Sequence, residues 1–119
     1  MRKLTESPFT VIEVLDEPGQ GGACHEYQIL SSPQTANETQ ALYGNVRFQN
    51  GSVKEFGVNG CHQEDLLAIV IDRLQSFQAG PFPCEENQAA LEHCMEALFW
   101  LHERTRGRRR RGVEGVNKL

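Results

Sequence analysis

The chain has 119 residues, of which 39% are hydrophobic and 8% aromatic, and its formal net charge is −4 at neutral pH. This length is enough for one modest core but not for two independent ones, so it predicts one compact domain. The longest aliphatic run, residues 66 to 71, is far too short to cross a bilayer, which argues against a membrane protein.

The N-terminus and the cysteines indicate the compartment. Residues 1 to 15 start basic but contain two glutamates and a proline, with no apolar core before a small-residue cleavage site, so we expect no secretory signal. The four cysteines could form two disulfides in an oxidising compartment. Without an export signal, we expect reduced thiols and a cytoplasmic location.

The charge is unevenly distributed along the chain. Residues 1 to 103 carry five Lys/Arg against fifteen Asp/Glu, whereas residues 104 to 119 carry seven against one. An acidic body therefore ends in a basic tail. Such a tail attracts phosphate groups, either those of a nucleic acid or those of a small anionic ligand.

Two segments near the N-terminus have the composition of β-strands. Residues 9 to 15 are rich in β-branched and aromatic side chains, and residues 26 to 30 alternate polar and apolar side chains. Residues 31 to 40 are polar and contain a proline, which predicts an exposed loop.

A β-hairpin is predicted next. Residues 45 to 49 and 52 to 56 flank Asn50-Gly51, the dipeptide that most readily forms a type I′ turn. Residues 1 to 56 should therefore form a small antiparallel β region of three or four strands. Such a sheet is too small to be stable unless something covers its apolar face.

The pattern of residues 57 to 119 predicts an antiparallel helical hairpin with a basic tail. Apolar residues recur at three- and four-residue spacing over residues 66 to 77, and Gly80 lies where a helix ends. After the connector Gly80-Pro81-Phe82-Pro83, a second helix should begin near Pro83 or Cys84. Its apolar residues lie on nearly every side, more than one helix and a small sheet can cover. The fold class is thus α+β, and we expect an oligomer.

Metal binding and catalysis are disfavoured. Cys24-His25 and Cys61-His62 are repeated dipeptides, but adjacent side chains point apart, whereas zinc ligands are usually paired two to four residues apart. The chain has no nucleophile at a telling distance from a base, no phosphate loop and no dinucleotide fingerprint. We therefore expect a non-enzyme without a metal or other cofactor, and a zinc-stabilised module is the less favoured alternative.

The arginines that end the second helix have three interpretations. They can bind nucleic acid, offset the helix dipole, or clamp the phosphates of a small ligand. The acidic body would repel a long polyanion, which disfavours nucleic acid. In an antiparallel pair, Phe77 and Asn87 share one pole while Arg104 and Arg108 lie at the other, so only an antiparallel dimer would unite them. Taken singly, Phe77 could be a core residue and Asn87 a polar residue at a helix start.

Seven segments of the C-terminal half form a recognisable series of motifs: 63–74, 77–82, 86–87, 96–98, 100–101, 104–105 and 111–115. In this order they resemble the first described phage anti-Thoeris sponge family, which shares its helical hairpin with anti-CBASS cyclic-nucleotide sponges. The likeness covers residues 57 to 116, and the N-terminal half agrees only in kind.

The resemblance implies a non-enzymatic trap in the cytoplasm of an infected bacterium. Such sponges hold the cyclic ADP-ribose isomers (glyco-cyclic ADP-ribose) that Thoeris TIR proteins make, without cleaving them. They form homodimers that can associate into hexamers, and some also bind cyclic oligonucleotides of CBASS at separate sites. A small nucleic-acid-binding protein that uses the arginine-rich C-terminus is the alternative function.

The resemblance also assigns residues. By motif, Phe77 would stack on adenine, Asn87 would hydrogen-bond the ligand, and Arg104 and Arg108 would engage base, ribose and diphosphate. Aromatic stacking and bidentate guanidinium groups suit these roles.

A second site for cyclic oligonucleotides is expected to be lost or altered. Family members commonly have an arginine where this chain has Glu85, and a threonine after the glycine at position 115, where it has Val116. A carboxylate beside bound phosphates repels them. The residues of this second site would be Glu85, Gly115 and Val116.

Overall fold

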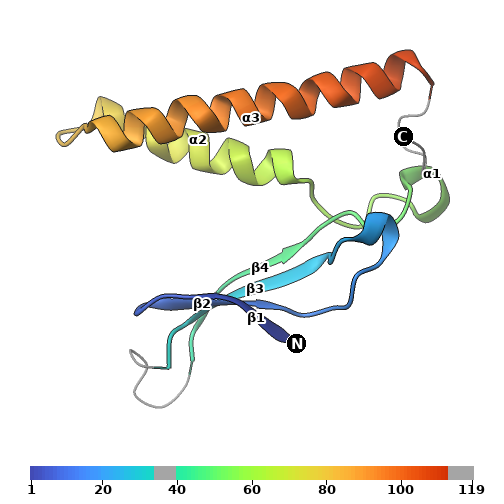
Figure 1. Cartoon of the computed structure of the whole chain (residues 1–119), viewed down its shortest axis with the longest axis horizontal. Coiled ribbons are helices and arrows are strands. Elements are labelled where there is room, and N and C mark those ends of the chain that lie inside the picture. Colours follow the sequence, from blue (N-terminus) through green and yellow to red (C-terminus); the bar gives the residue numbers. More distant parts are fainter. Residues whose placement is uncertain (34–39, 113–119) are drawn as a thin grey trace. The chain divides into compact units, whose positions relative to one another are not determined.

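The computed structural model describes residues 1 to 33 and 40 to 112 (Figure 1). The chain divides into two compact units, Met1–Cys61 and His62–Leu119, each of which is described by itself. The first contains a four-stranded antiparallel sheet and the second a pair of long helices. This is the predicted α+β class. The exposed loop predicted over residues 31 to 40 is wrong at its start, where Ser31 ends a strand and both Ser31 and Ser32 are buried. Residues 34 to 39 of that prediction lie outside the described residues.

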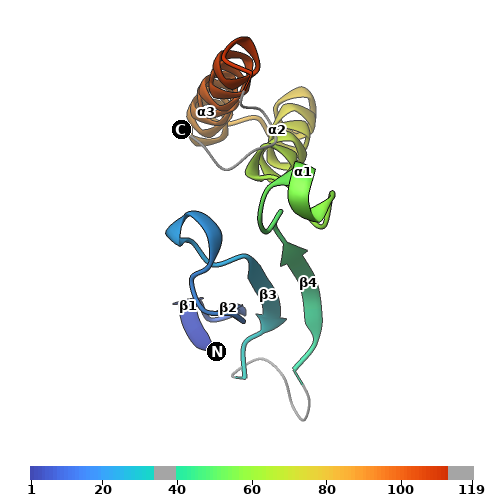
Figure 2. The same cartoon turned by 90° about the vertical axis from the view of Figure 1, so that its right-hand side faces the viewer.

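The sheet of the β unit has its strands in sequence order (Figure 2). They are β1 (Arg2–Glu6), β2 (Thr10–Val14), β3 (Glu26–Ser31) and β4 (Leu42–Arg47). β2 and β3 occupy the segments predicted as strands. β1 was not predicted, because its five residues are mostly polar and all exposed, and only backbone pairing with β2 defines it.

The core of this unit is small. Val11 and Val14 of β2 and Cys24 are its buried apolar side chains, whereas Phe9, Leu42 and Tyr43 are more than half exposed. Tyr27 and Phe48 add an edge-to-face ring contact at 5.7 Å. A core of this size stabilises a sheet weakly, so polar contacts must contribute.

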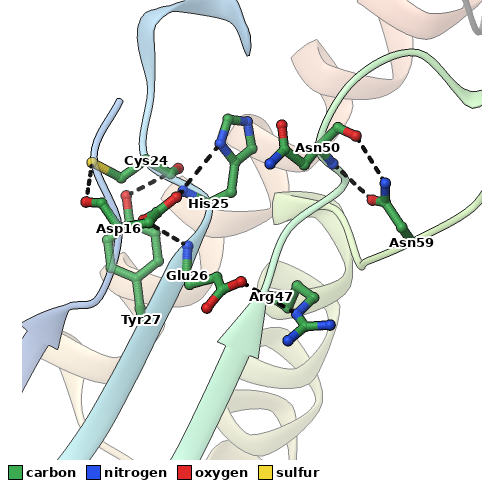
Figure 3. A network of polar contacts seen from close by, with 8 residues as sticks. All are labelled: Asp16, Cys24, His25, Glu26, Tyr27, Arg47, Asn50 and Asn59. Atoms are coloured by element: carbon green, nitrogen blue, oxygen red, sulfur yellow. Dashed lines mark hydrogen bonds and ion pairs between the residues drawn. The ribbon is translucent and has the colours of Figure 1, made fainter. Parts of the chain in front are cut away.

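A polar network closes the loop between β2 and β3 (Figure 3). The Asp16 carboxylate accepts hydrogen bonds from the backbone N–H groups of His25 (2.9 Å) and Glu26 (3.1 Å). His25 is buried, and its Nδ1 lies 3.9 Å from Asp16 Oδ2. Burial by itself would raise the pKa of Asp16, but these hydrogen bonds and the attraction of His25 lower the pKa below its ordinary value.

The predicted hairpin over residues 45 to 56 is wrong in its second half. β4 supplies the first strand, but the second segment forms the helical turn α1 (Val53–Phe56). Ser52 caps this turn by accepting a hydrogen bond from the Glu55 backbone N–H at 3.3 Å. Ser-x-x-Glu is the signature of a helix start, and this local signal prevails over strand propensity.

Asn50-Gly51 still turns the chain, with Gly51 at φ +83°. Asn59 then holds the turn: the Asn50 backbone N–H donates to its Oδ1, and its Nδ2 donates to the Asn50 carbonyl, both at 2.8 Å (Figure 3). The Gln49 side chain also donates to the Gly57 carbonyl at 2.8 Å. These contacts satisfy backbone groups that a second strand would otherwise have paired.

The helical unit is an antiparallel hairpin of α2 (Gln63–Ala79) and α3 (Glu85–Arg110), which pack against each other (Figure 1). Both helices occupy the predicted positions. The Asp65 carboxylate accepts from the His62 backbone N–H at 2.9 Å at the start of α2, and Gly80 follows its end. Ile71 and Leu91 are the buried apolar residues of this seam.

Much apolar surface stays exposed on the hairpin, as its composition predicted. Met95, Phe99 and Trp100 of α3 are 48%, 51% and 62% exposed, and Ile69 of α2 is 59% exposed. The Phe99 and Trp100 rings pack edge to face at 5.2 Å. Within the described ranges, no helix combines the length and apolar character that a membrane crossing needs.

Candidate functional site

A surface pocket of about 250 Å³ lies where α2 ends and α3 begins. It brings together Phe77 and Asn87, the two residues predicted to share this pole. Complete sites for small molecules are usually larger, roughly 300 to 1,000 Å³. The pocket by itself is therefore smaller than a complete small-molecule site usually is. Its lining consists of Ser76, Phe77, Gly80, Pro81, Phe82 and Asn87.

The connector between the helices presents a second aromatic ring. Phe82 stands between Pro81 and Pro83 and is 85% exposed, while Phe77 is 47% exposed. Sequence reasoning gave Phe82 no role, although an aromatic residue between two prolines in a tight connector is a signal of an exposed ring.

Arg73 covers one face of Phe77. Its guanidinium carbon lies 5.2 Å from the ring centroid, within cation–π range, and the two residues are one helical turn apart. Arg73 does not line the pocket, so it stacks on the ring without filling that space. Sequence reasoning missed this residue too, and its i, i+4 spacing from Phe77 was the available signal.

Asn87 lies in the first turn of α3. Its backbone N–H donates to the Sγ of Cys84, the N-cap residue, at 3.5 Å. Among the residues that the structure describes, none hydrogen-bonds the Asn87 side-chain amide. Its donors and its acceptor are therefore available to a ligand in the pocket.

Arg104 and Arg108 lie near the other end of α3 and do not line the pocket. Along the helix, Arg104 is about 26 Å from Asn87, at a rise of roughly 1.5 Å per residue. Arg108 is buried, at 8% exposure. That burial, and then the positive charges of Arg104 and Arg111, lower the pKa of Arg108. One helical unit does not unite the predicted arginines with Phe77 and Asn87.

The residues of the predicted second site are only partly described. Glu85 is the first residue of α3 and is exposed. Gly115 and Val116 lie outside the described residues. The loss or alteration of this site stays a prediction.

The cysteines are all free thiols, and Cys24 is the buried one. Across residues 1–33 and 40–112, no group of three or more His, Cys, Asp or Glu side chains could hold a metal ion. The Cys24-His25 pair instead belongs to the polar network around Asp16, where Cys24 Sγ donates to the Asp16 carbonyl at 3.4 Å.

The family model of the Acb2/Tad1 hairpin domain matches residues 43 to 106, which is more than half of the chain. The chain belongs to this family. The Acb2/Tad1 match starts inside β4 and spans α2 and most of α3, so it contains the whole pocket and Arg104 but stops before Arg108.

One relative is the protein named "Thoeris anti-defense 1" of Bacillus phage SBSphiJ7. It is 46% identical over 88 residues, which are 74% of this chain and 62% of the relative. The chain thus spans less than two thirds of the relative's length. Together with the Acb2/Tad1 match, this identity confirms the family resemblance seen in the sequence.

Proposed function

We propose that this chain is a phage anti-defence sponge that binds cyclic ADP-ribose-type immune signals and holds them without cleaving them. The observation that carries the proposal is the pocket shared by Phe77 and Asn87 within the Acb2/Tad1 hairpin. The name of the relative, "Thoeris anti-defense 1", supports the anti-defence role. The proposed location is the cytoplasm of the infected bacterium, where such signals act.

The pocket has the chemistry to hold a base. The free face of Phe77 can stack on adenine, and Phe82 offers a second ring beside it. The unpartnered amide of Asn87 can donate to and accept from the base edge or a ribose hydroxyl. These groups recognise a nucleotide without acting on its bonds.

Phosphate binding would come from a second copy of the chain. Arg104 and Arg108 are too far along α3 to reach the pocket of their own hairpin, so the proposed complete site is a dimer interface. The exposed side chains of Met95, Phe99 and Trp100 give that dimer apolar surface to bury. Hexamers built from such dimers are the proposed larger assembly.

The pocket favours binding over hydrolysis. Its one hydroxyl, Ser76 Oγ, donates to the backbone carbonyl of Asp72 at 3.0 Å. A carbonyl oxygen cannot take the proton of an attacking nucleophile, and an activated serine needs a positioned base. The Ser76 hydroxyl therefore bonds to the backbone of its own helix and not to a catalytic base.

The decisive experiment is capture and release. Purified protein is mixed with glyco-cyclic ADP-ribose, separated from free ligand, and heated. We expect the ligand to disappear from solution and return intact on denaturation, and a cleaved product would make the protein an enzyme instead.

Phe77→Ala should weaken this capture by about 5- to 150-fold, the range expected for losing a stacked base. Arg108→Ala should also weaken capture, and because Arg108 is buried, melting curves are recorded to show that this variant is folded. The matched control Phe9→Ala removes an exposed ring from the β unit and should bind normally. Equal binding by Phe77→Ala and Phe9→Ala would contradict the assigned pocket.

If Glu85 disables the second site, replacing it should restore binding there. Glu85→Arg restores a cation at the start of α3, so we expect it to bind a cyclic trinucleotide at least tenfold more tightly than the wild type does. Glu86→Arg is the control for charge alone. Stoichiometric trinucleotide binding by the wild type would show that Glu85 does not disable the site.

The nucleic-acid alternative is tested on the same samples. Electrophoretic shifts with duplex and single-stranded DNA at two salt concentrations would show steep salt dependence if the arginines of α3 bound a polyanion. We expect no such shift.

A further inference from the structure

Gln78 bridges the two ends of the connector by bonding both backbone groups of one residue. Its Nε2 donates to the Cys84 carbonyl at 3.0 Å, and its Oε1 accepts from the Cys84 N–H at 3.1 Å. Nε2 also reaches Gln88 Oε1 at 3.3 Å. Such a two-way contact copies the paired bonds between antiparallel strands and fixes orientation as well as distance. We call the Gln78–Cys84 pair the amide clamp.

The amide clamp lies between the ligand-binding groups. Gln78 directly follows Phe77, and Cys84 contacts the Asn87 backbone through its Sγ at 3.5 Å. A continuous set of contacts thus runs from the Phe77 position to the Asn87 position. The connector that contributes Gly80, Pro81 and Phe82 to the pocket is enclosed by the clamp.

The connector has few other means of holding this shape. Pro81 and Pro83 have no backbone N–H to donate. Gly80 donates to the Phe77 carbonyl at 3.2 Å, which ties it to α2 but not to α3. The packing of α2 against α3 holds the helices together along their length. The Gln78 side chain joins the end of α2 to the start of α3 through the amide clamp and through Gln88.

We propose that Gln78 is a positioning residue that preorganises the pocket. By fixing the start of α3 relative to the end of α2, it sets the spacing between the Phe77 ring and the Asn87 amide before ligand arrives. A preformed site avoids the entropy cost of ordering the connector on binding. Gln78 therefore controls affinity without lining the pocket, an inference that rests on the proposed function.

The test measures affinity for glyco-cyclic ADP-ribose by calorimetry, using the full chain. Gln78→Ala should raise the dissociation constant about tenfold. Gln75→Ala, an exposed glutamine of the same helix, is the matched control and should bind as the wild type does. The titrations are made at a temperature where melting curves show every variant fully folded. A role in global stability alone predicts equal affinities there, and that result would overturn the inference.

Gln78→Glu tests the clamp through the pH dependence of ligand affinity, which destabilisation alone would not change. Its carboxylate can accept a hydrogen bond from the Cys84 N–H, but it cannot donate one to the Cys84 carbonyl, so two acceptor oxygens would repel each other there. When protonated, the acid regains a donor, so affinity should rise as pH falls from 8 to 5 while that of the wild type changes less. The facing carbonyl raises the pKa of such a carboxyl from its ordinary value of about 4.3, and the hydrogen bond from the Cys84 N–H opposes that rise. A pH profile parallel to that of the wild type would contradict the clamp.

Hydrogen exchange at the Cys84 amide tests the clamp without ligand. We expect faster exchange in Gln78→Ala than in Gln75→Ala, and unchanged exchange would overturn the proposal. Failure of the wild type to bind glyco-cyclic ADP-ribose would instead overturn the proposed function, and with it the affinity role of Gln78. Binding by the wild type with equal binding by Gln78→Ala would overturn the positioning role alone.

Discussion

The β unit and the helical unit are held together by different kinds of contact. The β unit has a small apolar core, and side-chain hydrogen bonds from Asp16, Gln49 and Asn59 secure its loops. The helical unit is held by an apolar seam around Ile71 and Leu91 and by one amide clamp. A helix satisfies its own backbone, whereas a loop between strands must find partners.

The two units also differ in whether their polar side chains are already bonded to the backbone or are open to a ligand. In the β unit, polar side chains such as Asp16 and Asn59 already bind the backbone. In the helical unit, the Asn87 amide and one face of Phe77 are open. The family match is centred on the helical unit and takes in only the end of the sheet.

Gly60→Ala is expected to cause the largest difference in stability between the β unit and the helical unit. A Cβ at Gly60 would lie 2.5 Å from the Phe48 carbonyl carbon and 2.7 Å from the Arg47 oxygen, where backbone must move. We expect a loss of about 2 to 3 kcal/mol in the β unit. Hydrogen exchange followed by mass spectrometry should show β2 and β3 opening while α2 and α3 stay protected.

Gly44→Ala is the control for Gly60→Ala, because its Cβ would meet only the Ile29 side chain at an ordinary 3.7 Å. It should leave exchange in both units nearly unchanged. If Gly60→Ala lost protection from hydrogen exchange equally in both units, the units would unfold together and would not be independently stabilised.

A smaller effect is expected from Asp16→Asn, and it depends on pH. Because the pKa of Asp16 is lowered by folding, its carboxylate stabilises the β unit above its unfolded pKa of about 3.9, and that stabilisation is lost as pH falls through the folded pKa. The variant should therefore melt below the wild type at pH 7, and the gap in melting temperature should narrow as pH falls below about 3.9. Glu17→Gln, at the next position, should show no such gap. A gap that is constant with pH would contradict the role of the Asp16 charge.

The smallest effect is expected from Arg73→Gln in the helical unit. Losing an exposed cation–π contact should weaken ligand binding by about two- to fivefold, because Phe77 keeps its ring but loses the guanidinium behind it. Arg47→Gln removes an arginine that pairs with Glu26 in the β unit and serves as the control. Fluorescence-based titration of both variants checks the difference, and a loss of more than a hundredfold would mean that Arg73 contacts the ligand directly.

The two units also differed in how well the sequence predicted them. The apolar periodicity of residues 66 to 77 and the Gly80-Pro81 stop identified α2, and the start of α3 followed from its connector. In the β unit, β1 has no pattern of its own because it is exposed on every residue. The Asn50-Gly51 hairpin was wrong because Ser52 and Asn59 offer local hydrogen bonds that a propensity argument does not weigh.

The residues that line the pocket were only partly predicted from the sequence. Helix pairing placed Phe77 and Asn87 at one pole, and the structure has them in one pocket. Phe82, Arg73 and Gln78 were not predicted because the exposure of Phe82, the ring contact of Arg73 and the Gln78–Cys84 hydrogen bonds depend on the folded shape of the hairpin. Sequence spacing reports which residues share a helix face, but it does not report which side chain crosses to a neighbouring helix.

The lone tryptophan makes the chain its own optical reporter. Trp100 lies on the exposed surface of α3, between the pocket and the arginine end, so its indole emits from water in a free monomer. Pairing of two copies through this surface would shift the emission to shorter wavelength as the protein concentration rises. Recording that shift with and without ligand shows whether capture of the ligand changes the protein concentration at which the copies pair.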